Sequence, residues 1–390
     1  MPQTLRNRFC WNPESRILFG GQAGGNLDRT LAALRQVIDA GTDFGLGPDG
    51  QPRPLPARPS GPYFQTLSGG STAAPKIIRR SQQSWIASFT ENTRLFDLSS
   101  ADCYAVLGKP VHSLALYAML EALHLGADLL LLADQRPDRQ AVAMAAQGAS
   151  ILYVTPAQLR QLCRQGVNMP TLRHILCGGG MLGADVRRLA LACCPNATLT
   201  EFYGAAETSF VTLSDAGTPL GSVGRAYPHV QVQIQAGGEV WVKSPYLFDD
   251  YAEGGCGQAT RDHDGFLTVG EVGYLDDQGY LFLEGRKDRM VTIADQNVFP
   301  EQAEAFLASD RQVGQVAVLP VFDARRGNIL CAILSGPEDA ALAARLLAAS
   351  RASLGPLRAP RHLLFCAEFP VLASGKPDLR ALAVWLEGRL

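Results

Sequence analysis

Alternation between two kinds of segment dominates the stretch from residue 63 to residue 202. Short apolar runs are followed by longer segments in which apolar residues recur at spacings of three and four. The runs predict strands and the spaced segments predict helices, and their alternation is typical of a parallel sheet covered by helices on both faces. We therefore expect an α/β protein with doubly wound, mostly parallel sheets. The expected strands are 63–67, 76–80, 103–107, 128–133, 151–154, 174–177 and 199–202, and the expected helices are 82–96, 113–125, 137–147, 156–165 and 184–193.

The segments on either side complete the expected architecture. Ile17–Phe19 predicts a strand, Asn26 could cap a helix over 27–40, and the Gly- and Pro-rich segment 44–62 predicts a loop. From about Gly221 only short strands separated by turns follow, which predicts a small β-barrel subdomain or a distorted sheet. The strands expected there are 230–234, 239–242, 266–269 and 280–283.

A compact unit of both helices and strands is expected at the C-terminal end. Its predicted helices are 300–308, 338–353 and 378–388, and its predicted strands are 314–320, 328–334 and 362–366. We place a domain boundary at about Asp288. Residues 1–287 are expected to form the large domain, with the barrel-like part at about 220–285, and residues 288–390 a small α+β domain.

Composition excludes several classes of protein. The net charge of −2 disfavours nucleic acid as a partner, and the most apolar stretch, Leu114–Leu132, is interrupted by charged residues and predicts no membrane span. Nine cysteines without a CxxC pair suit reduced thiols in the cytoplasm, and the N-terminal residues show no apolar leader. Lysine is scarce beside arginine, so each retained lysine is more informative than usual.

A glycine- and hydroxyl-rich segment, SGGSTAAPK, lies between two predicted strands at residues 68–76. Its glycines allow the backbone to approach an anion closely, and its hydroxyl and ammonium groups suit phosphate. The Walker A pattern is absent, and a surface hairpin turn is the alternative interpretation. The residues expected to bind phosphate are Ser68, Gly69, Gly70, Ser71, Thr72 and Lys76.

Two other turns follow predicted strands. Gly178–Met181 is a glycine turn that would permit flat contact with a planar ring, although a simple tight turn is the alternative. Glu207 follows strand 199–202, and the carboxyl end of such a strand borders the crevice where α/β sheets bind ligands. Glu207 could hold Mg²⁺ and Tyr203 could stack on a base; the alternative is a glutamate at the start of a helix.

Two more candidates lie further along the chain. Glu271 could accept hydrogen bonds from both ribose hydroxyls and Arg286 could clamp the same sugar, unless the pair is a hairpin with surface charges. Lys376 follows Ser374 and Gly375 on a loop near the C-terminus. Such a lysine could reach the cleft of another domain, and a solvated loop lysine is the alternative.

The order and spacing of these motifs resemble the adenylate-forming superfamily of acyl- and aryl-CoA synthetases, peptide-synthetase adenylation domains and luciferases, over roughly residues 60–390. The sequence of residues 68–72 is most similar to that of stand-alone aryl-acid adenylating enzymes. The sequences of residues 200–212 and 268–304 are most similar to those of acyl-CoA synthetases. The resemblance implies two half-reactions. A carboxylate attacks the α-phosphorus of ATP and expels pyrophosphate, and a thiol then attacks the acyl adenylate and releases AMP. It implies ATP and Mg²⁺, with coenzyme A or a carrier-protein phosphopantetheine as the thiol.

Matching motifs imply roles for individual residues. Lys376 would bridge the carboxylate and the α-phosphate, Glu207 would bind Mg²⁺, and Asp288 would be the hinge about which a mobile small domain rotates. His112 matches the gate beside the acyl pocket, and a packed or capping histidine is the alternative. The β- and γ-phosphates would meet the 68–72 segment and Lys76, the ribose Glu271 and Arg286, and the adenine Gly179, Gly180, Met181, Tyr203 and Gly204.

Several positions depart from the family pattern. Asp295 stands where a glycine normally lets the pantetheine arm pass, so the thioester step is less secure than adenylation. Ser113 replaces the Asn with which aryl-acid relatives read a ring hydroxyl, so a catechol or salicylate substrate is disfavoured. The other departures are Ala73 for Gly, Glu271 for Asp, Ala206 for Thr, Thr292 for Lys and Leu372 for Thr.

The chain has fewer residues before the phosphate loop than is usual in the family. We expect a reduced front part of the large domain and a homodimer or partner that covers an exposed edge or apolar face. The expected activity is ATP-dependent ligation of a small aryl or acyl carboxylic acid to coenzyme A or to an acyl carrier protein. A non-catalytic or regulatory nucleotide-binding relative and adenylation without thioester formation are the alternatives. A hydrolase is disfavoured because GxSxG and HExxH are absent.

Overall fold

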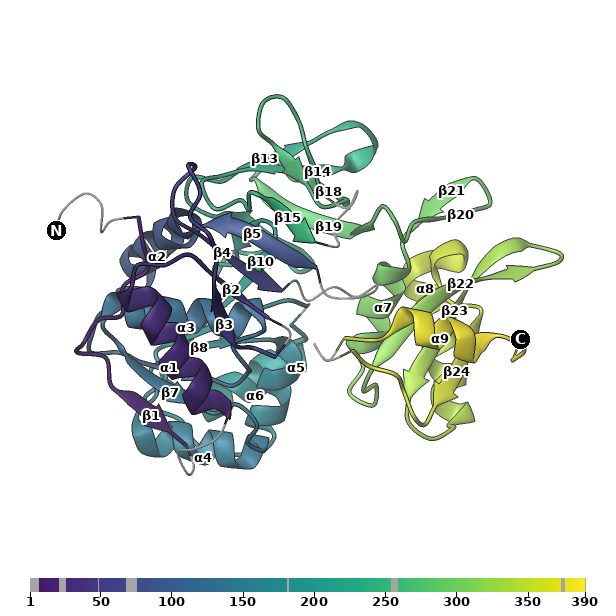
Figure 1. The fold of residues 1–390 in the computed structure, drawn as a ribbon. Coiled ribbons are helices and arrows are strands. Elements are labelled where there is room, and N and C mark those ends of the chain that lie inside the picture. The colour runs from purple at the N-terminus through teal and green to yellow at the C-terminus, as the bar shows by residue number, and fades with distance from the viewer. Residues whose placement is uncertain are drawn as a thin grey trace.

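The computed structural model describes residues 7–20, 26–47, 49–67, 76–180, 182–253, 259–372 and 376–389. These residues form a large N-terminal body and a smaller C-terminal body, connected through the strand that ends at Arg286 (Figure 1). No helix of the described residues is long and apolar enough to cross a membrane. The eight described cysteines all carry free thiols.

A mixed sheet of ten strands forms the centre of the large body. Its order is β1-β7-β6-β8-β9-β10-β11-β12-β19-β18. The pairs from β1 to β10 are parallel, and those from β10 to β18 are antiparallel. The strands are β1 (Ile17–Phe19), β6 (Cys103–Val106), β7 (Asp128–Leu131), β8 (Ile151–Val154), β9 (His174–Gly178), β10 (Thr198–Ala205), β11 (Ser209–Leu213), β12 (Ser222–Ala226), β18 (Glu271–Leu275) and β19 (Tyr280–Arg286).

Helices cover both faces of the parallel part, which confirms the doubly wound arrangement. Leu129 and Leu131 of β7 pack in one apolar cluster with α2 and α3, while Leu130 packs on the opposite face with α4, α5 and α6. The alternating direction of strand side chains produces this division. The helices are α1 (Asn26–Asp39), α2 (Gln82–Phe96), α3 (Ser113–Leu125), α4 (Pro137–Gln147), α5 (Pro156–Cys163) and α6 (Ala184–Cys193).

A second sheet differs from the expectation for residues 44–80. Its order is β15-β5-β4-β2-β3, and its pairs are antiparallel except β2 with β4. The expected strands 63–67 and 76–80 therefore lie outside the parallel sheet. The segment 44–62, expected as a loop, contains two strands. The members are β2 (Phe44–Leu46), β3 (Pro52–Pro54), β4 (Tyr63–Leu67), β5 (Ile77–Ser81) and β15 (Asp250–Glu253).

The region expected as a barrel-like part divides between two sheets. β12, β19 and β18 extend the ten-stranded sheet, and a separate four-stranded sheet runs in the order β13-β14-β17-β16. An isolated bridge between Glu239 and Val272 connects the two. The elements are β13 (Gln231–Ile234), the short 3₁₀ helix η2 (Ala236–Gly238), β14 (Val240–Lys243), β16 (Thr260–Arg261) and β17 (Leu267–Thr268).

The C-terminal body is a three-stranded sheet with helices packed on it, as expected. The order is β22-β23-β24, with β22 antiparallel to β23 and β24 parallel to it. A separate hairpin, β20–β21, follows the connection from the large body. The elements are β20 (Val291–Ile293), β21 (Gln296–Val298), α7 (Pro300–Ala308), β22 (Val316–Asp323), β23 (Gly327–Ser335), α8 (Ala340–Arg358), β24 (His362–Cys366) and α9 (Leu379–Leu386).

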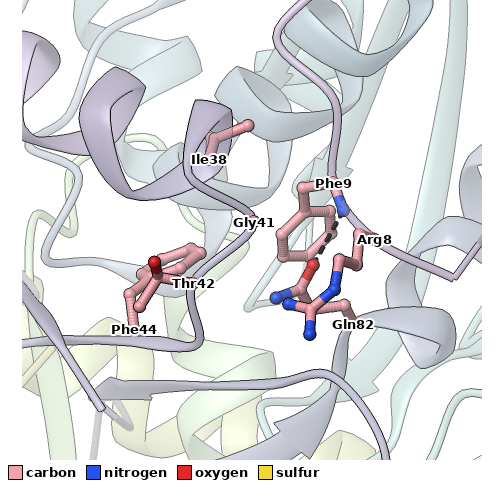
Figure 2. Close-up of a pocket in the computed structure, with 7 residues that line it drawn as sticks. All are labelled: Arg8, Phe9, Ile38, Gly41, Thr42, Phe44 and Gln82. Carbon is pink, nitrogen blue, oxygen red and sulfur yellow. Dashed lines mark hydrogen bonds between the residues drawn. The ribbon is translucent and has the colours of Figure 1, made fainter. Parts of the chain in front are cut away.

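The described N-terminal residues pack firmly on the large body. The amide of Phe9 donates to Gln82 Oε1 at 2.7 Å, and the Phe9 ring lies edge-on to Phe64 with ring centres 5.1 Å apart. A small cavity of about 10 Å³ remains beside Phe9, lined also by Ile38 and Phe44 (Figure 2). That volume suits a single water molecule, so the cavity is a packing gap rather than a substrate site.

Candidate active site

Two predicted site residues, Lys76 and Glu207, lie close together where the two sheets meet, with Tyr251 between them. The Lys76 ammonium lies 5.3 Å from the ring centre of Tyr251, and the Tyr251 hydroxyl donates to Glu207 Oε1 at 2.8 Å. Burial lowers the pKa of Lys76, and the nearby Glu207 carboxylate acts in the opposite direction. Lys76 directly precedes β5, Glu207 follows β10, and Tyr251 lies on β15, so three distant segments build this part of the site.

The turn that carries Glu207 has an unusual backbone. Ser209 has a φ of +55°, a left-handed conformation that is rare for residues other than glycine. Gly204 lies opposite, and a Cβ there would meet the Ser209 carbonyl oxygen at 1.8 Å, so residue 204 must be glycine. Thr208 Oγ1 accepts from the Ala205 amide at 2.9 Å. The turn is therefore held by its own contacts, and Glu207 is not at the start of a helix.

Glu271 and Arg286 lie opposite each other on β18 and β19. Arg286 Nη1 lies 3.6 Å from Glu271 Oε1, and Arg286 Nε lies 3.2 Å from Asp288 Oδ1. Burial raises the pKa of Glu271 to about 7, although Arg286 and Lys376 lower it. The two residues form a partly buried pair rather than unrelated surface charges.

Tyr203 lies within electrostatic range of this pair. Burial raises the pKa of its hydroxyl, and the neighbouring charges of Glu271 and Arg286 also act on it. The glycine turn follows the neighbouring strand β9, and Gly179 there has a φ of +83°. The ring of Phe202 lies against Gly178, where a Cβ would come within 2.3 Å of it. Gly204 and Gly179 are thus close in the sheet to Tyr203, while Met181 lies outside the described residues.

Lys376 of the C-terminal body has an exposed side chain that lies within electrostatic range of the pair formed by Glu271 and Arg286. Desolvation lowers its pKa, the Glu271 carboxylate raises it and Arg286 lowers it. Backbone hydrogen bonds join the two ends of its loop: the Leu372 amide donates to the Lys376 carbonyl at 2.8 Å, and the Asp378 amide donates to the Pro370 carbonyl at 3.0 Å. Ser374 and Gly375 lie outside the described residues.

His112 is placed at the start of α3 and beside the phosphate segment. It forms a parallel bridge with Leu67, the last described residue before residues 68–75. Its side chain makes no capping hydrogen bond, which removes the capping alternative. Burial and the neighbouring Lys109 lower its pKa, so the imidazole is neutral near pH 7. The expected phosphate-binding residues Ser68, Gly69, Gly70, Ser71 and Thr72 lie outside the described residues.

Sequence reasoning missed three residues that support the site. Tyr251 holds the Glu207 carboxylate, and Arg80 and Trp85 hold the turn behind it. One signal was available: Arg80 falls on the same side of the predicted strand as Lys76 and Ile78, where an apolar residue is expected. Tyr251 and Trp85 carried no such signal, because only the fold brings them to residue 207.

The residues present fit a magnesium ion bound together with phosphate. Glu207 supplies one carboxylate, and the described residues contain no group of three or more His, Cys, Asp or Glu side chains that would hold a metal alone. Mg²⁺ commonly takes one or two carboxylates and obtains its remaining ligands from substrate phosphates and water. A single carboxylate facing Lys76 is the arrangement expected for such an ion.

Comparisons with known proteins agree with this fold. The AMP-binding enzyme family matches residues 23–252, and the C-terminal domain of AMP-binding enzymes matches residues 302–376. The uncharacterized acyl-CoA ligase YhfT of Bacillus subtilis is 31% identical over 348 residues, covering 86% of this chain and 71% of YhfT. The putative long chain fatty acid-CoA ligase VraA of Staphylococcus epidermidis is 28% identical, covering 69% of this chain and 60% of VraA.

Solved structures show the same fold. The amide bond synthetase McbA from Marinactinospora thermotolerans superposes with a TM-score of 0.70 at 25% identity, covering 85% of this chain and 71% of McbA. The o-succinylbenzoate coenzyme A synthetase MenE from Bacillus subtilis, in complex with ATP and magnesium, has a TM-score of 0.73 at 20% identity, covering 82% and 69%. The chain belongs to the AMP-binding enzyme family and is an ATP-dependent acid ligase of the acyl-CoA ligase type.

Proposed function

We propose that the chain adenylates a small aryl or acyl carboxylic acid with ATP and transfers the acyl group to coenzyme A. One observation carries the proposal: Lys376 of the small body, although exposed, lies near enough to Glu271 and Arg286 of the large body for their charges to shift its pKa. Charges from the two bodies therefore interact at the proposed site. A non-catalytic nucleotide-binding relative would have no need for a lysine from the small body there.

In the first half-reaction the acid oxygen forms a bond to the α-phosphorus while the bond to the pyrophosphate oxygen breaks. The Lys376 ammonium would contact both the carboxylate and the α-phosphate, and would thereby offset the repulsion between two anions. Lys76 and the 68–72 segment would hold the β- and γ-phosphates, and Glu271 and Arg286 the ribose. Magnesium bound at Glu207 would neutralise phosphate charge.

In the second half-reaction the acceptor thiolate attacks the acyl carbon and AMP leaves. We assign Asp288 as the hinge about which residues 288–390 rotate, so that Lys376 leaves and the thiol enters. Asp288 Oδ1 lies 3.2 Å from Nε of Arg286 in the large body, whereas Nη2 of the next residue, Arg289, lies 2.7 Å from Glu304 Oε1 in the C-terminal body. Two neighbouring residues thus contact different bodies, which supports a hinge at this point.

Coenzyme A is the acceptor that the relatives' names favour, since YhfT, VraA and the indoleacetate-CoA ligase of Aromatoleum aromaticum, 27% identical over 361 residues, are all named as CoA ligases. A cavity of about 290 Å³ on the C-terminal body supports the assignment. Its basic lining residues are Arg326, Arg351, Arg361 and His362, and such a lining suits the phosphates of coenzyme A. Dephospho-coenzyme A should be a poorer acceptor than coenzyme A, whereas an acyl carrier protein that outcompetes both would replace coenzyme A in the proposal.

The substrate class is proposed as an aryl or medium-sized acyl acid. An aromatic cluster follows His112 in the fold: Tyr117 lies 5.4 Å from Phe210, and Phe202 lies 4.8 Å from Phe210, between ring centres. An apolar aromatic surrounding of this kind would suit a hydrophobic acid.

Cytoplasmic location and a homodimer are proposals as well. The free thiols of the described cysteines suit a reducing compartment, and light scattering tests the dimer.

Replacement of the catalytic lysine tests the proposed function. Lys376→Ala should abolish acid-dependent AMP formation and leave ATP binding within about twofold, because Lys376 acts on the α-phosphate and the acid while other residues hold the nucleotide. Lys243→Ala, a lysine of β14 that lies 5.6 Å from the Phe266 ring, serves as the matched control. A Lys376→Ala variant with a normal rate would show that the catalytic assignment is wrong.

A further inference from the structure

A fully buried arginine lies behind the predicted metal site. Arg80 is 0% exposed. Its guanidinium donates from Nη1 to Ser209 Oγ at 2.5 Å and from Nη2 to the carbonyl oxygens of Tyr246 at 3.1 Å and Glu207 at 3.5 Å. It also lies 5.3 Å from the ring centre of Trp85, whose indole nitrogen donates to the same Ser209 hydroxyl at 3.2 Å.

This arginine is costly to bury. Among the described residues no carboxylate forms an ion pair with Arg80, although Asp249 lies near enough to raise its pKa. Burial lowers the pKa of Arg80 to about 10, so the side chain is still a cation near pH 7. Its Nε has no hydrogen-bond partner in the described structure. A buried cation that is bonded to carbonyls and a hydroxyl stabilises a protein poorly, which makes a role other than stability more reasonable.

The contacts of Arg80 join the three segments that build the metal site. Lys76, Ile78 and Arg80 alternate along the chain and share the buried side of the β5 segment. The guanidinium then reaches the turn that carries Glu207 and the segment that leads to Tyr251. Ser209, whose side chain accepts the hydrogen bond from Arg80, has a left-handed φ of +55°. A strained residue persists only where the surrounding structure determines it, and here Arg80 and Trp85 both bond its side chain.

We propose that Arg80 is a positioning residue for the metal-binding carboxylate: its guanidinium fixes the Ser209 turn, and through that turn it holds Glu207 in the orientation that receives magnesium beside the phosphates. The inference rests on the proposed role of Glu207 as the metal ligand. Arg80 itself touches neither metal nor nucleotide. The shape of guanidinium matters, because two separate nitrogens of its planar fork bond the Ser209 hydroxyl and the Tyr246 carbonyl, whereas a lysine ammonium presents its donors from one nitrogen.

The test measures the binding of ATP by calorimetry with and without Mg²⁺, in the absence of any acid. Wild type is compared with Arg80→Met, Arg80→Lys and Glu207→Gln. Arg79→Met is the control, because Arg79 is the preceding residue and pairs with Asp250 at 3.3 Å on the other side of the strand. AMP, which lacks the β- and γ-phosphates, is the control ligand. Circular dichroism and thermal unfolding verify the fold of each variant.

We expect Arg80→Met to reduce the gain in ATP affinity that Mg²⁺ supplies by about tenfold, as substitutions behind metal ligands commonly do, and to leave AMP binding unchanged. Combined with Glu207→Gln it should cause no further loss. Arg80→Lys should show a smaller loss of the same kind, and it replaces Arg80→Met as the decisive variant if the latter does not fold. Arg79→Met should behave as wild type.

Three results would overturn the inference. One is a Mg²⁺ response in the Arg80 variants equal to that of wild type, and the second is an equal loss of AMP and Mg·ATP binding, which would show a merely structural role. In both cases ligase activity of the wild type would leave the proposed function intact. The third is the absence of a Mg²⁺ response in the wild type, which would remove the role of Glu207 as well.

Discussion

Glu271 is the site residue whose protonation should be visible in the activity. Burial raises its pKa to about 7, so about half of the carboxyl groups are protonated at neutral pH in the free protein. In the proposed role the ionised form would accept hydrogen bonds from both ribose hydroxyls, and we therefore expect the KM for ATP to fall severalfold as the pH rises from 6 to 8. Glu271→Gln should flatten this dependence. Parallel KM profiles of wild type and variant would contradict the assignment.

Glu121 should affect stability rather than catalysis. It is buried between α2, α3 and β8, where Asn92 donates to it at 2.8 Å and Tyr153 at 2.7 Å. Burial raises its pKa to about 7 from an ordinary value of 4.5. The native state therefore binds the proton more tightly than the unfolded state. The stability that Glu121 contributes is complete below pH 4.5 and is lost as the pH rises through 7.

Glu121→Gln should remove this loss. Between pH 5 and pH 7.5 we expect the free energy of unfolding of the wild type to fall by up to about 3 kcal/mol more than that of the variant. Denaturant unfolding at several pH values measures the difference. Glu91→Gln is the control, because the pKa of Glu91 is lowered and its contribution changes only at more acidic pH. Equal pH slopes for wild type and Glu121→Gln would refute the prediction.

At the scale of elements, local signals located the helices of the large body closely. The bounds of α2, α3, α4 and α6 agree with the predicted ranges, because each has apolar periodicity and end signals. Ser81 caps α2, and Gly126 and Gly148 end α3 and α4 in left-handed conformations. Such signals lie within a few residues of the helix end, so the sequence alone contains them.

Strands formed by distant pairing were missed. β2 and β3 lie in a segment rich in Gly and Pro, and they become strands by pairing with β4 and with each other.

The site residues divide in the same way between local motifs and distant contacts. The sequence predicted Glu207, Glu271, Arg286 and Lys376, each of which belongs to a recognisable local motif. It did not predict Arg80 or Tyr251, whose roles depend on contacts with residues far along the chain.

The β20–β21 hairpin explains a departure from the family pattern. Its two turn residues, Ala294 and Asp295, have φ values of +48° and +61°, as a two-residue turn of the primed type requires. Glycine suits such a position, and Asp tolerates it better than most residues. Asp295 thus keeps the turn but adds a charged side chain where the family has none.

Asp295→Gly should accelerate thioester formation severalfold from preformed acyl adenylate and leave adenylation unchanged. The reason is that the turn geometry is retained while the side chain is removed from the expected path of the thiol. Asp295→Asn is the control for charge alone. Single-turnover transfer measures the effect, and equal transfer rates for the wild type and the Asp295→Gly variant would show that the hairpin does not border that path.

At the scale of the molecule, an exposed ion pair lies directly before the proposed hinge. Lys287 Nζ lies 3.1 Å from Glu239 Oε2, one residue before Asp288. Because both residues precede the hinge, the pair should persist when residues 288–390 rotate, and because the lysine is exposed it should stabilise the large body by less than about 1 kcal/mol. Lys287→Gln should therefore leave the rate of thioester formation relative to adenylation within about twofold of wild type. Stopped-flow measurement of both half-reactions tests this, with Lys243→Gln as control; a larger change would show that Lys287 contacts a substrate.

Adenylation of a carboxylic acid is the central claim, and acid-dependent exchange of pyrophosphate into ATP tests it most directly. The purified chain would be assayed with a panel of benzoates, cinnamates, arylacetates and fatty acids, beside Lys376→Ala. The account predicts strong exchange with one group of related acids and none with the variant. ATP binding without exchange for any acid would contradict the account and favour a nucleotide-binding protein that does not catalyse adenylation.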